Sequence, residues 1–112
     1  SDEEEYGLLQ YMFPSVDSQL LKTVSSISFL TRSESKSDNP RIGSGISTRT
    51  SVEIAGLLFD GFSIQESADI TIYPQYDNDG GVDSERTFVK QIVQKFLDDG
   101  SSDDLFDVEE EN

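Results

Sequence analysis

The sequence predicts an all-α fold: a small bundle of four helices, preceded by a short helix and followed by a disordered acidic tail. Apolar residues recur at spacings of three and four in several successive segments, which is the pattern of a helix with one buried face. No stretch sustains the alternation of a half-buried strand, although ADITIYP (68–74) hints at one. The 112 residues correspond to one domain, or to a piece of one.

The first two helices are separated by Pro14. Acidic residues followed by apolar residues at helical spacing predict a short helix over 2–13, because acids favour the first turn and proline ends the pattern. Asp17 is a good N-cap for a second helix, predicted over 17–31. The serine-rich segment 32–45, with its proline and two glycines, then predicts a long loop.

The third helix follows GSGISTRT and has two candidate starts. With Ser47 as N-cap, Arg49 occupies the second helical position. A capping box of Thr50 with Glu53 is the alternative, and it leaves Arg49 just outside the helix. In either case Gly61 is the expected C-terminal stop.

Two further helices complete the bundle. Ser63 and Glu66 form a capping box, and Pro74 ends that helix. Asp83 or Ser84 caps the last helix, which carries the strongest amphipathic pattern of the chain. We expect its apolar face to lie in the core: Phe88, Val89, Ile92, Val93, Phe96 and Leu97.

Composition excludes several classes of function. The chain has no cysteine and no histidine, so disulfides, zinc sites of the Cys/His kind and histidine acid–base catalysis are ruled out. A net charge of -15 lacks the basic surface that phosphate backbones require, so no direct nucleic-acid partner is expected. Apolar runs are too short to span a membrane, and no signal peptide is recognisable. We therefore expect a cytoplasmic protein without membrane contact.

The acidic tail, residues 99–112, has two interpretations. Like charges repel and little apolar surface is available for burial, which predicts disorder and a solubilising role. Leu105, Phe106 and Val108 lie among the acids, and this pattern also suits a short motif that folds onto a basic groove of a partner protein.

No metal or phosphate loop is complete in the chain. Asp77, Asp79 and Gly80 partly match a calcium loop, but the twelve-residue spacing is absent and a turn is expected instead. No GxxxxGK[ST] segment is present. We therefore expect no metal site and no complete catalytic apparatus in this chain.

Arg49 is the candidate functional residue because a cation is disfavoured at the positive end of a helix. One interpretation is an exposed ion pair with Glu53, one turn further on. The other is a ligand phosphate, held by free backbone N–H groups and the guanidinium together.

Four segments carry a resemblance to a known family. They are FPSVDSQLLKTVSSISFLTR (13–32), GISTRTSVEIAGLL (45–58), DGFSIQESADITIYP (60–74) and SERTFVKQIVQKF (84–96). Over roughly residues 8–97 the chain resembles the C-terminal part of a MoxR-type AAA+ ATPase, and within that family the ATPase subunits of cobalt and magnesium chelatases. The most specific element is GISTRT.

The resemblance implies that Arg49 is the sensor 2 arginine, which contacts the γ-phosphate of ATP. Ser47 and Thr48 would adjoin the nucleotide, although the family often has proline where Thr48 stands. Walker A, Walker B, sensor 1 and the arginine finger would precede Ser1. ATP and Mg would then be bound mainly by residues outside this chain, which should be inactive alone.

By the same resemblance, residues 1–15 are the last helix of the large AAA+ domain and the hinge, 16–98 are the helical lid domain, and 99–112 are the tail. Implied partners are the chain's own large domain, neighbouring ring subunits, and a protein substrate or adaptor. The lid would couple ATP hydrolysis to remodelling of a partner complex by rotating as a rigid body. Metal chelation itself does not follow from the likeness.

A non-enzymatic alternative remains open. In it, the chain is an acidic helical adaptor whose C-terminal tail docks a basic partner protein. A protein that mimics nucleic acid also fits the net charge, but not the concentration of that charge in the tail.

Overall fold

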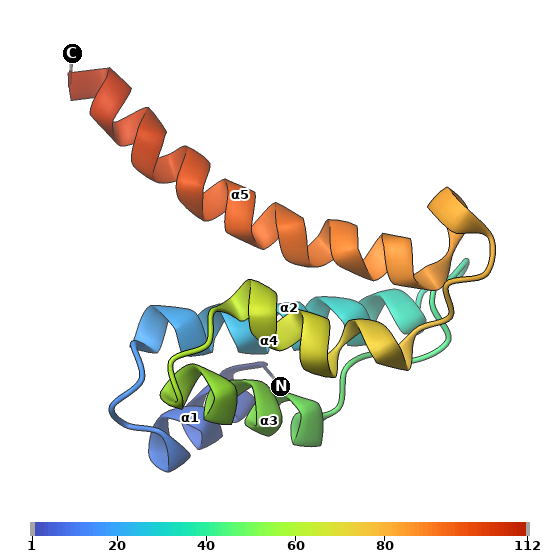
Figure 1. Cartoon of the computed structure of the whole chain (residues 1–112), viewed down its shortest axis with the longest axis horizontal. Helices are drawn as coiled ribbons and strands as arrows, with labels where there is room; N and C mark the ends of the chain where they lie inside the picture. Colours follow the sequence, from blue (N-terminus) through green and yellow to red (C-terminus); the bar gives the residue numbers. More distant parts are fainter. Residues whose placement is uncertain (1, 112) are drawn as a thin grey trace.

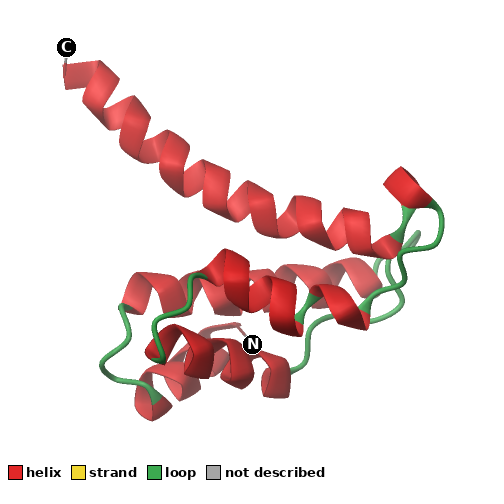
Figure 2. Ribbon diagram, viewed as in Figure 1, coloured by secondary structure: helices red, strands yellow, loops and turns green. Residues whose placement is uncertain are grey.

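The computed structural model describes the backbone of residues 2–111 and the side chains of residues 2–98. Five α-helices occur in this part of the chain, and no strand, so the all-α fold class is confirmed (Figure 2). They are α1 (Asp2–Met12), α2 (Ser18–Ser35), α3 (Thr48–Phe59), α4 (Ile64–Thr71) and α5 (Glu85–Glu111), with single turns η1 (Tyr73–Gln75) and η2 (Gly81–Asp83) before α5.

Helix α2 is the centre of the bundle. It packs against α1, α3 and α5, while α4 packs on α3. Figure 1 shows α5 along one side of the bundle, with α1 and α3 on the opposite side. The largest fully buried apolar side chains come from most of these elements and from the loop before α3: Leu9, Leu21, Val24, Ile42, Ile46, Ile72, Val89 and Val93.

Side-chain caps begin four of the helices, as their sequences predict. Asp17 accepts the N–H of Gln19 at the start of α2. Ser63 and Glu66 form the complete capping box of α4. Ser84, rather than Asp83, starts α5 by accepting an N–H from its first turn. Each cap satisfies a donor that has no partner within its own helix.

Helix α3 begins at the first of its two candidate starts. The Ser47 hydroxyl accepts the N–H of Thr50 at 3.2 Å, so Ser47 is the N-cap and Arg49 is the second helical residue. The alternative capping box of Thr50 with Glu53 is not formed. Gly61, at φ 100°, follows the last turn, and its N–H returns to a carbonyl of α3.

Helix α2 is longer than the sequence pattern predicts. It continues to Ser35 rather than ending near residue 31, so Arg32 is helical and not part of the loop. The polar residues there contain no helix breaker before Pro40, and the Ser35 hydroxyl bonds back to the carbonyl of Arg32 at 2.8 Å. The long loop therefore starts at Lys36.

That loop is fastened to α5. The Arg41 guanidinium lies 4.4 Å from the centroid of the Phe88 ring, a cation–π contact. The N–H of Gly43 donates to Glu85 at 2.9 Å. Between these two contacts the side chain of Ile42 is buried in the core. The loop is consequently held in place although its sequence is polar.

Helix α1 shares the core of the other helices. Leu9 is fully buried between them, and the rings of Phe13 and Phe59 pack with centroids 6.2 Å apart. Residues 2–13 and the helices after them are thus one packing unit among the described residues. The assignment of 1–15 to a separate large domain has no counterpart in this packing and stays a prediction.

The C-terminal helix confirms one prediction and leaves another open. Val89, Ile92 and Val93 are buried, so the apolar face of α5 does belong to the core. The described backbone of residues 99–111 continues α5, without described side chains, and the predicted disorder of 99–112 stays a prediction. Within the described chain, no helix has the length and apolar character needed to cross a membrane.

Candidate functional site at the start of α3

Arg49 is exposed at the second position of α3. In the described part of the chain its guanidinium has no hydrogen bond and no ion pair. The ion pair with Glu53 that the sequence allows is therefore not formed. The side chain is free to meet an anion from outside the bundle.

Backbone donors lie beside this guanidinium. The N–H of Thr50 is taken by the Ser47 hydroxyl, and that of Ser51 by the Ser47 carbonyl at 3.1 Å. No hydrogen bond to the N–H groups of Thr48 or Arg49 occurs among the described residues. Two backbone donors and one guanidinium thus share the positive end of a helix, an arrangement that favours an anion.

The two other predicted ligand residues have internal roles. The Ser47 hydroxyl is the helix cap, and it also lies 3.2 Å from the hydroxyl of Thr50. The Thr48 hydroxyl donates to Glu5 Oε1 at 2.6 Å. Of the three predicted site residues, Arg49 is therefore the one whose side chain is unoccupied in the described chain, while Ser47 and Thr48 shape the start of its helix.

Glu5 is a buried carboxylate that sequence patterns do not single out. It is 5% exposed, and it accepts three hydrogen bonds from two other helices. Arg32 Nη2 and Thr48 Oγ1 donate to Oε1 at 2.7 and 2.6 Å, and Ser51 Oγ donates to Oε2 at 3.0 Å. The Ser28 hydroxyl lies against that of Ser51 and continues the chain of hydroxyls into α2.

The carboxylate of Glu5 is held in its charged form. Burial by itself raises the pKa of Glu5, but the hydrogen bonds from Thr48 and Arg32, the positive charge of Arg32 and the hydroxyl of Ser51 together outweigh it. The pKa of Glu5 therefore lies below its ordinary value of 4.5. Near neutral pH the site contains a complete buried ion pair.

Arg32 also fixes the backbone before α3. Its Nε donates to the carbonyl of Ile46 at 2.6 Å, and the hydroxyl of Thr31 accepts the N–H of Ile46 at 2.9 Å. A Cβ added at Gly45 would lie 2.4 Å from the Cα of Arg32, so only glycine permits this approach of loop to helix. The start of α3 is thus set by α1 and α2 together.

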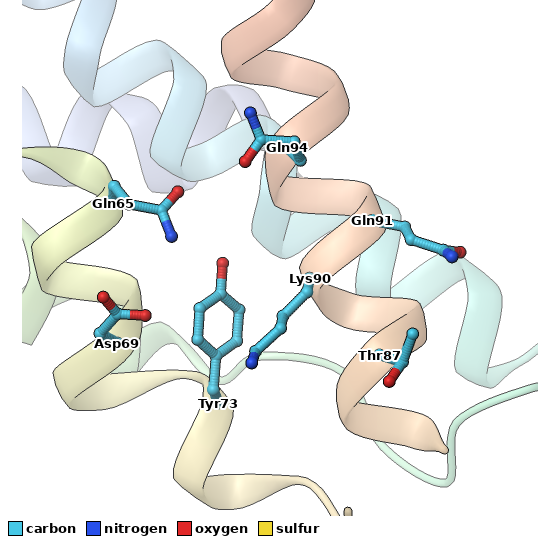
Figure 3. Close-up of a pocket in the computed structure, with 7 residues that line it drawn as sticks. All are labelled: Gln65, Asp69, Tyr73, Thr87, Lys90, Gln91 and Gln94. Carbon is cyan, nitrogen blue, oxygen red and sulfur yellow. The ribbon is translucent and has the colours of Figure 1, made fainter. Parts of the chain in front are cut away.

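Two of the hollows that the described residues form lie beside the start of α3 and between α4 and α5. The first, of about 230 Å³, opens beside the start of α3 and is lined by Glu4, Glu5, Leu8, Arg32 and Thr48. The second, of about 320 Å³, lies between α4 and α5 (Figure 3) and is lined by Gln65, Asp69, Tyr73, Thr87, Lys90, Gln91 and Gln94. Arg49 lines neither, so its side chain stands on the outer surface.

The hollow between α4 and α5 has the ring of Tyr73 among its lining residues. Figure 3 shows the Tyr73 ring between the two helices, with Lys90 reaching towards it. Lys90 Nζ lies 5.3 Å from the ring centroid. Burial, with the nearby negative charge of Asp69, raises the pKa of the Tyr73 hydroxyl. These contacts are explained by packing between the helices, without a ligand.

The segment that partly matches a calcium loop is a turn in the structure. Asp77 Oδ1 accepts the N–H of Asp79 at 2.8 Å, which is a turn contact. No cluster of three acidic side chains that could hold a metal ion occurs among the described residues. The tentative partner-binding residues Leu105, Phe106 and Val108 lie outside the residues whose side chains are described.

Comparison with protein families, with curated proteins and with solved structures finds no match to this chain. The geometry of the described residues defines one candidate site: the outward-facing start of α3, with Arg49 and two unoccupied backbone donors, built on the Glu5–Arg32 pair.

Proposed function

We propose that this chain contains the helical lid of a AAA+ ATPase of the MoxR and chelatase type, with Arg49 as the residue that contacts the γ-phosphate of bound ATP. The observation that carries the proposal is the state of the four arginines. Arg32 pairs with Glu5, Arg41 lies over an aromatic ring, and Arg86 donates to the carbonyl of Tyr76 at 3.1 Å. Of these four arginines, all of them in the described part of the chain, Arg49 is the one without such a partner.

The position of Arg49 also supports a phosphate ligand. A cation in the first turn of a helix is unfavourable by a few tenths to about 1 kcal/mol, unless an anion is present. Phosphate oxygens can accept from the guanidinium in a bidentate manner and from the two free N–H groups at the same time. In a chain with 23 acidic residues, a free arginine at this place is best explained by such a ligand.

In the proposed enzyme, ATP and Mg bind mainly to a large domain outside this chain, and the lid closes on the nucleotide through Arg49. Loss of the γ-phosphate releases this contact and lets the lid rotate as a rigid body. In this proposal the hinge lies at the end of residues 1–15, so its motion has to open the contacts that bury Glu5 and Leu9 against the other helices. The proposed setting is the cytoplasm, with neighbouring ring subunits and a substrate protein or adaptor as partners.

The test is Arg49→Ala in the full-length protein. We expect ATP turnover to fall by about 100- to 1,000-fold, the scale on which one charge-stabilising donor contributes to a transition state. Lys95→Ala is the matched control, because it removes another exposed cation far along the sequence. Turnover of Arg49→Ala equal to that of the control would reject the lid assignment. A GxxxxGK[ST] segment within roughly 200–250 residues upstream is the expected companion feature.

The acidic adaptor remains a second candidate because the net charge is -15 and is concentrated towards the C-terminus. In this proposal, residues 99–112 dock onto a basic groove of a partner protein. Deleting 99–112 should then abolish binding of basic partner proteins at moderate salt. Unchanged binding after the deletion would leave the tail as a solubilising segment.

A further inference from the structure

We propose that Glu5 and Arg32 are positioning residues for Arg49: they lock the start of α3 to α1 and α2, and so fix the backbone position from which the Arg49 side chain extends. This inference rests on the proposed function only for its effect on ATP turnover. The lock itself concerns residues of this chain and can be measured in the chain alone.

The first half of the lock is Glu5, which ties α1 to the first turn of α3. One carboxylate holds Thr48 and Ser51, the residues one before and two after Arg49. Both hydrogen bonds go to an ionised acceptor, and such bonds are about twice as strong as neutral ones. Rotation of the first turn of α3 would break both bonds and leave a buried carboxylate with fewer donors.

The second half of the lock is Arg32, which fixes the segment before α3. Both backbone groups of Ile46 are bound by neighbouring residues of α2, the carbonyl by Arg32 and the N–H by Thr31. Gly45 lies against the backbone of Arg32 with no room for a side chain. The chain therefore reaches Ser47 from a fixed direction, and the helix cap forms at a fixed place.

Arg32 joins the two halves, since one guanidinium bonds to Glu5 and to Ile46. Its side chain is 29% exposed, at the wall of the hollow beside α3. The Ser47 hydroxyl by itself caps α3, so the contacts of Glu5 and Arg32 are more than the helix start requires. When the backbone that carries Arg49 is held in place, less conformational freedom is lost as an anion binds, and the affinity for the anion is higher. Through the lock, α1 thus influences phosphate sensing although it does not contact the ligand.

The mildest test variants are Thr48→Val and Arg32→Lys. Thr48→Val removes the hydroxyl that donates to Glu5 and that accepts from Arg32 Nη2 at 3.5 Å. Arg32→Lys keeps a cation for Glu5 but cannot also reach Ile46 in the same way. Thr71→Val is the matched control, since its hydroxyl donates only within α4. In this chain, both variants should speed hydrogen exchange at the amides of Ile46, Thr50 and Ser51 by at least about fivefold. The control should leave the exchange rates of these amides unchanged. If the control speeds exchange as much as the two variants do, the lock is overturned.

Turnover of the full-length ATPase tests whether the lock acts through Arg49. Thr48→Val should lower kcat several-fold, and it should have no further effect in an Arg49→Ala background, because a positioning residue has nothing left to position. Equal losses in both backgrounds would overturn the inference, since they indicate a general structural role. If Arg49→Ala is slow while Thr48→Val and Arg32→Lys turn over ATP at the wild-type rate, the positioning role is rejected and the proposed function is not. Wild-type turnover of Arg49→Ala rejects the proposed function, with the exchange result still deciding whether the lock exists.

Discussion

Arg32 Nη2 lies 2.7 Å from Glu5 Oε1, and this ion pair of residues 27 apart in sequence joins α2 to α1 at the point where α3 begins. Glu5 is almost completely buried, whereas Arg32 is partly exposed. The pair therefore differs from surface ion pairs, which contribute little to stability. Its carboxylate also receives two hydroxyl donors from α3, so the loss of one partner leaves several polar groups unsatisfied.

Replacing Glu5 by alanine should destabilise the chain by about 2–4 kcal/mol. Three donors lose a charged acceptor, and each such loss is worth about 1–3 kcal/mol before the exposed side of Arg32 is solvated by water. The measurement is urea unfolding followed by circular dichroism. Glu3→Ala is the control, because Glu3 is an exposed acid of the same helix. If Glu5→Ala lowers the free energy of unfolding no more than the control does, this carboxylate does not stabilise the fold as proposed.

The contribution of Glu5 should depend on pH in a defined direction. Its pKa in the folded chain lies below the ordinary value of 4.5, so the folded state favours the charged form. The stabilisation is then fully present above about pH 4.5 and is lost as the pH falls through the folded pKa. The difference in unfolding free energy between wild type and Glu5→Gln should be larger at pH 7 than at pH 3. A difference that grows towards acid would reverse the sign and contradict this account.

Local signals made most of the fold predictable. Ser47, Ser63 and Glu66 act within three residues of sequence, so their capping contacts can be recognised without any tertiary information. The position of Arg49 in its helix follows from the same cap. What local patterns cannot supply is whether a nearby acid engages this arginine, and Glu53 does not do so among the described contacts.

The supporting pair was not predictable for a physical reason. A glutamate in the first turn of a helix is already explained by the helix dipole, so Glu5 carries no visible sign of a second role. Its contact with Thr48 spans 43 residues and depends on the packing of α1 against α3. Arg32 is hidden by its serine-rich surroundings, which predict a loop, although no breaker ends α2 before Ser35.

Gly45 should be irreplaceable at the crossing of the loop with α2. An alanine Cβ there would lie 2.4 Å from the Cα of Arg32 and 2.5 Å from its backbone nitrogen, so backbone atoms would have to move. We expect Gly45→Ala to destabilise the chain by about 1–3 kcal/mol, as overpacking does. Gly43→Ala is the matched control, since no atom lies within 4 Å of its added Cβ. Thermal unfolding of the two variants side by side checks the difference.

Arg49 should slightly lower the stability of the isolated chain, although the proposed enzyme needs it for ATP turnover. Its cation stands at the positive end of α3 and has no partner among the described residues to offset it. Arg49→Glu should therefore stabilise this chain, by about 0.3–1 kcal/mol at low salt, because an acid in the first turn is favourable. The same substitution should abolish ATP turnover in the full-length protein, because it opposes a phosphate with a negative charge. Thermal unfolding at 20 mM and 500 mM salt measures the first effect, which high salt should screen. A variant less stable than wild type at low salt would show that Arg49 has a structural partner and is not held free for an anion.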